Sequence, residues 1–385
     1  MDSINRIFGS AVSVLDGRVT VKDETALTSD RTDRLARAAV FGSRDEKEYA
    51  RWLVWEIGQS VGVRAASIHD LYMARGRGEI RGFTVPAINV RGLTYDTGRS
   101  IFRTAIRMRA GAFILEIARS EIGYTEQRPA EYVSVLLAAA LREGFRGPVF
   151  IQGDHFQVNV KKWKADPKTE VDAVKQLVRE AVAAGFYNID IDTSTLVDLS
   201  QKTLDEQQRP NYEVGIDILR TVRQVQPKGV TISAGGEIGE VGTENSTEPE
   251  LRAFMDGFNR TLPKGVAGLS KISVQSGTSH GGVVLADGSI AEVKLDLDTL
   301  ERLSTVARLV HGSATVLDVG GRTAILRSFL PDELSTRQKP RPRTGSIFLA
   351  GHSGREATLL DSWADSRRQP LCRGNHFISA AIGQT

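Results

Sequence analysis

The sequence predicts a TIM (β/α)8 barrel preceded by an α-helical N-terminal extension. From residue 82 onward, short apolar runs alternate with amphipathic stretches six times, which is typical of βα units in a parallel sheet. Polar residues follow several of these runs, as in a barrel, where the chemistry is spread over the carboxyl ends of several strands. No G-x-G-x-x-G turn follows the first run, which disfavours an open dinucleotide-binding sheet.

Composition indicates a globular protein that can bury a large core. The chain has 385 residues, of which 41% are apolar and 25% are charged. It has no apolar run long enough to cross a bilayer, and its first residues lack the pattern of a signal peptide, so a cytoplasmic location is expected. Its single cysteine, Cys372, allows no internal disulfide and no thiolate metal cage. A metal would therefore be bound by histidines and carboxylates.

Residues 1–80 are expected to form a hairpin and helical extension. Valines alternate on both sides of Asp16-Gly17, a pair that favours the two-residue turn of a β-hairpin at 11–23. The stretches 46–60 and 66–78 have apolar residues at three- and four-residue spacing, which predicts helices.

Residues 81–336 are expected to form the barrel domain. The apolar runs that predict its first six strands are 83–90, 112–118, 147–153, 187–192, 230–235 and 269–275. The amphipathic stretches that predict the following helices are 97–109, 130–144, 170–185, 204–225, 248–262 and 298–310. This regular order predicts helices on the outer side of a parallel sheet.

Residues 337–385 form a basic, atypical tail. The net charge of the chain is +3, and this segment alone carries eight Lys or Arg against three acidic residues. The remainder is slightly acidic and lacks interleaved basic and aromatic residues, so neither nucleic acid nor a membrane is an expected partner. The tail is interpreted as a solvated appendage, as the product of a shifted reading frame, or as the last βα unit, with its strand at 346–351.

Candidate site residues stand at or just after the ends of the predicted strands. They are Asn89, Ser120, Asp154, His155, Asp192, Glu237 and His280, followed after one more helix by His311. The chain has only six histidines, and three of them belong to this set. Imidazoles that converge at one mouth beside carboxylates favour an open divalent-metal site with room for water or substrate.

Several of these segments resemble the class II, metal-dependent fructose-bisphosphate aldolases, over about residues 82–315. FTVPAINV resembles the opening strand of that family and places Asn89 at its asparagine. IARSEIGY places Ser120 at the serine that contacts substrate. QGDH places Asp154 at the catalytic aspartate and His155 at the first zinc-binding histidine.

The later segments continue this resemblance in the same order. GGEIGEVG places Glu237 at the glutamate near the metal. SGTSHGG places His280 at the second zinc-binding histidine and Gly281 beside the phosphate. VHGSAT resembles the strand end that carries the third zinc-binding histidine, here His311, followed by the phosphate-binding positions Gly312 and Ser313.

The resemblance implies a zinc-dependent aldolase that cleaves a ketose-bisphosphate, such as fructose 1,6-bisphosphate, into dihydroxyacetone phosphate and an aldehyde phosphate. Zinc would stabilise the carbanion beside the carbonyl, and the site allows a monovalent cation as well. Asp154 would transfer the proton of the C4 hydroxyl, and Glu237 is assigned a catalytic role as well. Asn89, Ser120 and Asp192 are expected to contact the phosphorylated sugar. A homodimer or larger homo-oligomer is expected.

Two departures from the aldolase pattern leave alternatives open. The acidic loop after Glu237 offers Glu240, Glu244 and Glu248 as competing proton-transfer carboxylates. No Asn-x-Asp-Thr motif follows His311. A non-catalytic, aldolase-like accessory subunit is therefore one alternative. A metal-dependent hydrolase or isomerase on the same barrel is another, because a fold does not determine one function.

Overall fold

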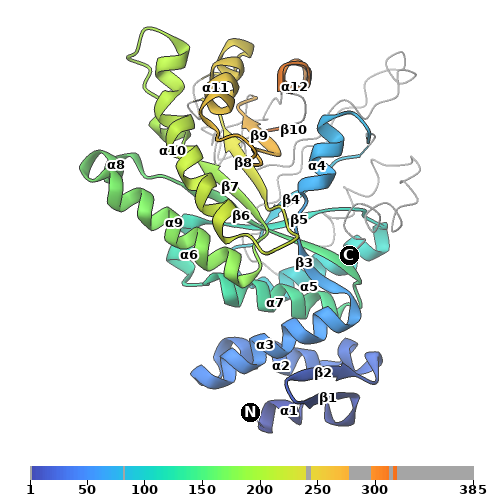
Figure 1. Cartoon of the computed structure of the whole chain (residues 1–385). Helices are drawn as coiled ribbons and strands as arrows, with labels where there is room; N and C mark the ends of the chain where they lie inside the picture. Colours follow the sequence, from blue (N-terminus) through green and yellow to red (C-terminus); the bar gives the residue numbers. More distant parts are fainter. Residues whose placement is uncertain (1, 81–82, 240–243, 277–295, 312–314, 319–385) are drawn as a thin grey trace, which may run out of the picture.

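A computed structural model describes residues 2–80, 83–239, 244–276, 296–311 and 315–318. Within these ranges, an N-terminal group of helices and one hairpin precedes a parallel sheet with helices packed along it (Figure 1). The tail at 337–385 and the strand expected at 346–351 lie outside the described residues.

The N-terminal hairpin forms as predicted. Strands β1 (Val12–Leu15) and β2 (Arg18–Val21) pair in antiparallel fashion. The two turn residues between them, Asp16 and Gly17, have φ angles of 49° and 72°. Two positive φ angles in succession match the right-handed twist of the flanking strands, which is why Asp-Gly favours this turn.

Helices make up most of the remaining N-terminal segment, as expected. They are α1 (Asp2–Asn5), η1 (Gly9–Ala11), η2 (Glu24–Thr28), α2 (Asp30–Phe41) and α3 (Arg44–Val61). Helix α3 corresponds to the predicted 46–60. It begins at a reciprocal cap between Ser43 and Glu46 and ends at Gly62, whose φ of 79° stops the helix.

The carboxylate of Asp33 ties this segment to the helices of the sheet. Its Oδ1 accepts hydrogen bonds from Tyr95 Oη at 2.7 Å and from Arg142 Nε at 3.0 Å. The two donors lie on α5 (Thr94–Met108) and α7 (Pro129–Arg142). One side chain of α2 therefore connects two helices that are far away in the sequence.

The central sheet is parallel throughout and has the order β10-β9-β8-β7-β6-β5-β4, with β3 also pairing with β6. Its strands are β3 (Val63–Ala66), β4 (Ala87–Asn89), β5 (Ile114–Ala118), β6 (Gly147–Gln157), β7 (Asn188–Asp192), β8 (Ser233–Glu237), β9 (Lys271–Val274) and β10 (Thr315–Asp318). Strands β4 to β9 are the six that the apolar runs predict.

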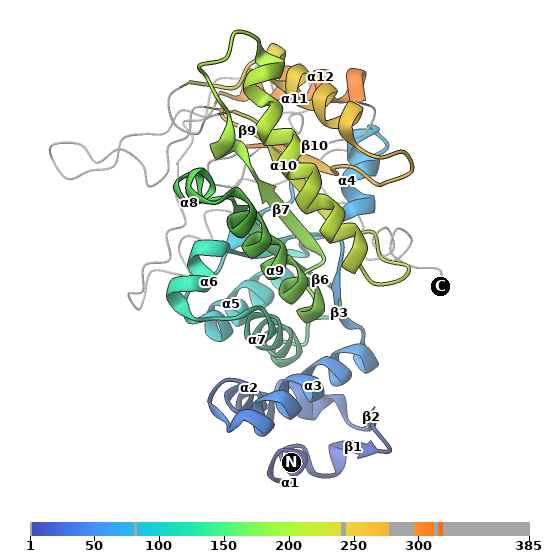
Figure 2. The same ribbon diagram turned by 60° about the vertical axis from the view of Figure 1, so that its left-hand side comes forward.

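The six predicted helices are also present. Besides α5 and α7, they are α9 (Pro167–Ala184), α10 (Leu204–Val225), α11 (Glu248–Thr261) and α12 (Leu297–His311). Helix α4 (His69–Gly76) precedes them, and the shorter elements α6 (Arg119–Thr125), α8 (Val160–Ala165) and η3 (Ser194–Leu196) lie between them. Figure 2 shows α9 and α10 running along β6 and β7.

The closed (β/α)8 barrel is wrong for the described residues, because the sheet is open. Strand β4 pairs only with β5 at one end, and β10 pairs only with β9 at the other, within the described ranges. Periodicity along the chain identifies each βα unit, but closure depends on pairing between the first and last strands, which local sequence does not encode.

Strand β3 is a second difference from the expectation, since the sequence predicted no strand at 63–66. The helix predicted at 66–78 is present as α4. Asn188 at the start of β7 holds the end of β3 in place. Its Nδ2 donates to the carbonyl oxygens of Ala66 (3.1 Å) and Ile151 (3.0 Å), and its Oδ1 accepts from the backbone N–H of Ile68 (2.9 Å). Because a buried amide with three partners is costly to disrupt, this position joins the N-terminal segment firmly to the sheet.

The two faces of the sheet bury different sets of side chains. Leu115 and Ile117 of β5 belong to the large apolar core that includes the surrounding helices. The alternate residue Ile114 packs instead with Phe150 and with Tyr72 of α4 in a separate cluster. We call the face with Ile114 the inner face. Among the described residues, no helix has both the length and the hydropathy that crossing a bilayer requires.

Candidate active site

A layer of polar side chains lies on the inner face, directly beyond the apolar cluster around Ile114. Glu116, Gln152, Asp190 and Lys271 belong to it and come from β5, β6, β7 and β9. Gln152 links them: its Nε2 donates to Glu116 Oε2 at 2.5 Å and to Asp190 Oδ2 at 2.9 Å. Its Oε1 accepts from Lys271 Nζ at 2.5 Å. We call these four residues the inner layer.

Asp154 and His155 reach the same site because β6 has a bulge. Gly153 pairs with Ile189 and Phe156 with Ile191, so that two residues of β6 stand opposite the single residue Asp190. In a regular strand, neighbouring side chains point to opposite faces. An extra residue re-aims a side chain and is common beside active sites.

The backbone of the bulge is unusual at two positions. His155 has a φ of 40°, in the left-handed region that a non-glycine residue seldom adopts. A Cβ at Gly153 would lie 2.5 Å from two ring carbons of Phe156, so only glycine leaves room for the ring to fold back. Phe156 is fully buried and holds the bulge against the core.

His155 lies between two carboxylates. Its Nδ1 is 3.2 Å from Asp154 Oδ1, and its Nε2 is 3.5 Å from Glu237 Oε2. Glu237 ends β8, so β7 separates the two strands that supply this contact. The three side chains are largely buried, with Glu237 only 3% exposed.

Charge and burial shift the pKa values at this site strongly. The negative charge of Asp154 raises the pKa of His155 to about 10, and the charge of Glu237 adds to this rise. Burial acts in the opposite direction. Burial raises the pKa of Glu237 well above its usual range, and Asp192 adds to the effect. Burial and then the charge of Asp154 do the same to Glu116. Buried ionisable groups with pKa values shifted this strongly are typical of functional sites.

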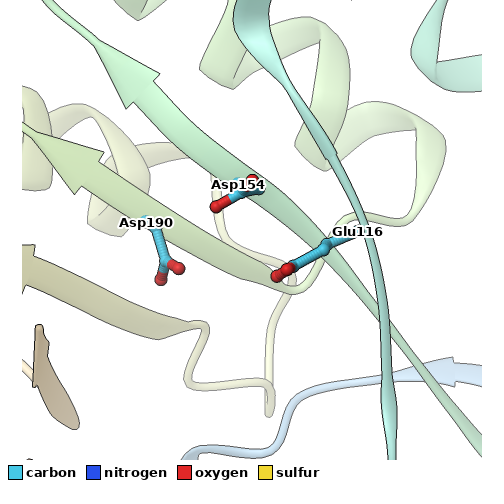
Figure 3. A group of neighbouring side chains, drawn as sticks. All are labelled: Glu116, Asp154 and Asp190. Carbon is cyan, nitrogen blue, oxygen red and sulfur yellow. The ribbon is translucent and has the colours of Figure 1, made fainter. Parts of the chain in front are cut away.

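The donor atoms fit a divalent metal ion. Glu237 Oε1 is buried and has no hydrogen-bond partner among the described residues. It is close to an imidazole, and nitrogen and carboxylate ligands together suit zinc and similar ions. Glu116, Asp154 and Asp190 each offer an oxygen within 4.8 Å of the others (Figure 3). His155 and Glu237 are therefore the candidate ligands at the carboxyl ends of β6 and β8, which we call the mouth of the site. Glu116, Asp154 and Asp190 form a second group of carboxylates below the mouth.

The structure brings Asn89 to the site as well. Its Nδ2 donates to Glu121 Oε2 at 2.7 Å and lies 3.4 Å from Asp154 Oδ2. Glu121 also caps the backbone N–H of Ala118, and Arg91 pairs with its other oxygen at 2.9 Å. The carboxylate of Glu121, which Ala118 and Arg91 hold in place, thus orients the Asn89 amide toward Asp154.

Two other predicted residues are placed differently. Asp192 is buried, and its oxygens accept from Ser194 Oγ at 2.7 Å and from Gln157 Nε2 at 2.5 Å. Ser120 is the second residue of α6 and is exposed. Their contacts with substrate stay predictions.

The remaining predicted residues lie mostly where the structure gives no description. His280, Gly281, Gly312, Ser313 and Glu240 are outside the described ranges. His311 is the last residue of α12, ahead of β10, whereas the aldolase resemblance places it at the end of a strand. Of the other acidic-loop candidates, Glu244 is exposed and Glu248 begins α11.

Sequence reasoning missed the inner layer. Glu116, Gln152, Asp190 and Lys271 lie within predicted strands, where only apolar residues were expected at buried positions. The available signal was the single charged residue in the runs FILEIA and LSKISV. A charge within an apolar strand of a parallel sheet has to find a partner on a neighbouring strand.

Comparison with known proteins leaves the family of this chain open. No family model and no curated protein matches it. Among solved structures, it is similar to a probable tagatose 6 phosphate kinase from Sinorhizobium meliloti 1021 and to the fructuronate-tagaturonate epimerase UxaE from Cohnella laeviribosi. The first has 17% identity, a TM-score of 0.44 and 61% coverage of this chain. The second has 12% identity, a TM-score of 0.41 and 79% coverage. The matches span 58% of each of those chains, and likenesses this distant identify no family for this one.

Proposed function

We propose that the protein is a divalent-metal-dependent enzyme that forms a carbanion beside the carbonyl of a phosphorylated ketose. The observation that carries this proposal is the arrangement of Asp154, His155 and Glu237, in which an imidazole lies between two carboxylates. The bulge in β6 turns adjacent residues toward one site, which gives a proton-transfer group and a metal ligand side by side.

His155 and Glu237 would hold the ion, with His280 as the further ligand that the aldolase resemblance implies. When bound, the ion supplies Lewis-acid polarisation of a carbonyl group. The unpartnered Glu237 Oε1 supports this assignment, because a buried carboxylate oxygen without a hydrogen bond is costly unless a cation satisfies it. Zinc is proposed as the ion because the ligand set includes imidazole nitrogen.

Asp154 would act as the acid and base. Its side chain is only 13% exposed and contacts His155 on one side and Asn89 on the other. These contacts hold the carboxylate in one orientation, which proton transfer requires. In cleavage it would accept the proton of the C4 hydroxyl, and in condensation it would return it.

Retro-aldol cleavage of a ketose-bisphosphate is the reaction we propose, on the strength of the resemblance to class II aldolases over about residues 82–315. Asn89 and Asp154 meet within hydrogen-bond reach, as expected if both contact one substrate. The segment SGTSHGG supplies the glycines expected at phosphate.

Isomerisation or epimerisation is the second candidate, and Glu116 favours it. Moving a proton from one carbon to another benefits from two acid–base groups at one site. Glu116 and Asp154 have oxygens within 4.8 Å of each other, and Glu116 is buried beside it on the inner face. Both reactions pass through a carbanion next to a carbonyl, which cleavage forms when the C3–C4 bond breaks and isomerisation forms by removal of a proton from carbon.

One pair of assays separates these possibilities. Purified protein is incubated with fructose 1,6-bisphosphate, and dihydroxyacetone phosphate is measured with and without a chelator. In parallel, dihydroxyacetone phosphate is incubated in D2O, and deuterium incorporation is followed by NMR. Chelator-sensitive cleavage supports the aldolase. Chelator-sensitive deuterium incorporation, or conversion of the bisphosphate to another ketose or aldose seen by NMR, without cleavage supports the isomerase. If metal-loaded protein shows neither activity, the proposed function is contradicted and a non-catalytic subunit is favoured.

A further inference from the structure

Lys271 is a fully buried cation in the inner layer. Its side chain is 1% exposed, and its Nζ lies 2.6 Å from Asp190 Oδ1 and 2.5 Å from Gln152 Oε1. The ring of Tyr72 lies 6.0 Å from the same nitrogen. Removing an ammonium group from water is costly, so a buried lysine needs close, oriented partners such as these.

The backbone of β8 makes room for this ion pair. A Cβ at Gly235 would lie 2.3 Å from Asp190 Oδ1 and 2.8 Å from Lys271 Cε. Gly235 pairs with both Asp190 and Lys271 in the sheet, so it stands directly between the two strands that carry the pair. The glycine therefore allows the ammonium and the carboxylate to meet across β8.

Lys271 contacts one member of the group of three carboxylates below the mouth. Oxygens of Glu116, Asp154 and Asp190 lie within 4.8 Å of one another, a separation that a single hard cation can bridge. Gln152 contacts Glu116, Asp190 and the ammonium together, so the lysine is connected to two of the three acids. Three carboxylates this close repel each other unless one of them is protonated or a positive charge is nearby.

We propose that the Lys271 ammonium is the resident cation of the Glu116–Asp154–Asp190 group, so that this group takes no metal ion. The inner face then binds one divalent ion, at His155 and Glu237, and not two. This inference rests on the proposed function for the location of the first ion, but the role of Lys271 is tested separately. Lys271 is a positioning residue here, because it acts through Asp190 and Gln152.

The test measures how many ions the full chain binds before and after the positive charge is removed. Wild-type protein and Lys271→Met are saturated with Zn²⁺ and then dialysed against Mn²⁺, and both metals are counted by mass spectrometry. Carboxylate oxygens suit Mn²⁺, so Lys271→Met is expected to bind about one Mn²⁺ more per chain than wild type. An equal Mn²⁺ content in the two proteins overturns the proposal, and so does a second ion in wild type.

Two double variants separate this result from the first metal site. Lys271→Met with Asp190→Asn removes both members of the ion pair and is expected to bind no additional Mn²⁺. Lys271→Met with His155→Ala is expected to keep the additional ion while losing zinc. Wild type that binds no zinc contradicts the proposed function, whereas the difference between wild type and Lys271→Met still decides the role of Lys271.

Thermal unfolding covers the case in which Lys271→Met is too unstable to purify without metal. Recovery of its melting transition by Mn²⁺, with no such gain for wild type, supports the proposal. The proposal is overturned if Mn²⁺ at no concentration restores the folding of Lys271→Met while Lys271→Met with Asp190→Asn folds. Lys271→Gln, judged by the same ion count, replaces Lys271→Met if neither protein folds.

Discussion

His155 Nε2 lies 3.5 Å from Glu237 Oε2, although the two residues belong to strands that β7 separates. The contact spans the inner face at the carboxyl ends of the strands. It is possible because the bulge in β6 raises His155 out of the regular pleat. The proposed metal site therefore depends on the sheet as a whole and on one local irregularity.

The first prediction concerns metal content. Purified protein should carry about one Zn²⁺ or similar ion per chain, and His155→Ala or Glu237→Gln should lose most of it. His69→Ala is a matched control, because His69 begins α4 and the charges that act on it are those of Arg223, Asp70 and Arg77, none of which belongs to the site. This variant should retain the ion. Full metal content in both site variants contradicts the ligand assignment. Mass spectrometry of dialysed protein gives the measurement.

The second prediction concerns pH. Asp154 holds the pKa of His155 at about 10, so without metal the imidazole is protonated at neutral pH. A metal ion must displace that proton, and metal binding near pH 7 should therefore release about one proton from this residue. Calorimetry in buffers of different ionisation enthalpy counts the protons. Any residual metal binding by His155→Gln should release fewer protons than binding by wild type. An equal number of released protons contradicts the assignment.

The same shift predicts how stability depends on pH in the metal-free protein. A raised pKa in the folded state contributes stability that is fully present below the unfolded pKa of about 6.5 and is lost as pH rises through about 10. Between these values the loss should approach about 1.4 kcal/mol per pH unit for one proton. Urea unfolding with chelator, from pH 6.5 to 9.5, should give a flatter profile for His155→Gln than for wild type.

The third prediction concerns the bulge. Gly153→Ala places a methyl group 2.5 Å from the Phe156 ring, so we expect a loss of stability of about 1–3 kcal/mol together with a loss of activity. Phe156→Leu in the same chain shortens the obstructing side chain. The double variant should therefore be less destabilised than the sum of the two single variants. Additive losses in urea unfolding contradict this account of the glycine.

The fourth prediction concerns the N-terminal segment. Asp33→Ala removes the acceptor of Tyr95 Oη and Arg142 Nε, and should cost about 1–3 kcal/mol because the hydrogen bonds involve charged groups. Asp30→Ala on the same helix is the control, since its contact with Arg34 is exposed on both sides and should contribute little. Equal effects in chemical unfolding contradict the proposed anchoring role.

The predictable part of the fold was the part encoded locally. Apolar runs and amphipathic stretches identified β4 to β9 and the following helices because each pattern repeats within one element. The open sheet was not predictable in this way, and neither was β3, because both depend on pairing between distant segments. His311 ends α12, whereas the resemblance placed it at the end of a strand, because a short motif alone does not determine the kind of element that carries it.

The candidate site was predictable only at strand ends. Asn89, Asp154, His155 and Glu237 were identified and lie together. The inner layer was missed because Glu116 and Lys271 lie in the middle of apolar runs, and only three-dimensional pairing shows that each has a partner. A charged residue inside an apolar run therefore predicts a polar or oppositely charged partner on a neighbouring strand.

The most direct test of the central claim is Asp154→Ala, measured for metal content, melting temperature and cleavage of fructose 1,6-bisphosphate. Because Asp154 is assigned to proton transfer and His155 to the metal, the variant should keep its ion and fold while kcat falls by about 10²–10⁴. Unchanged kcat in a metal-loaded, active preparation would contradict the mechanism.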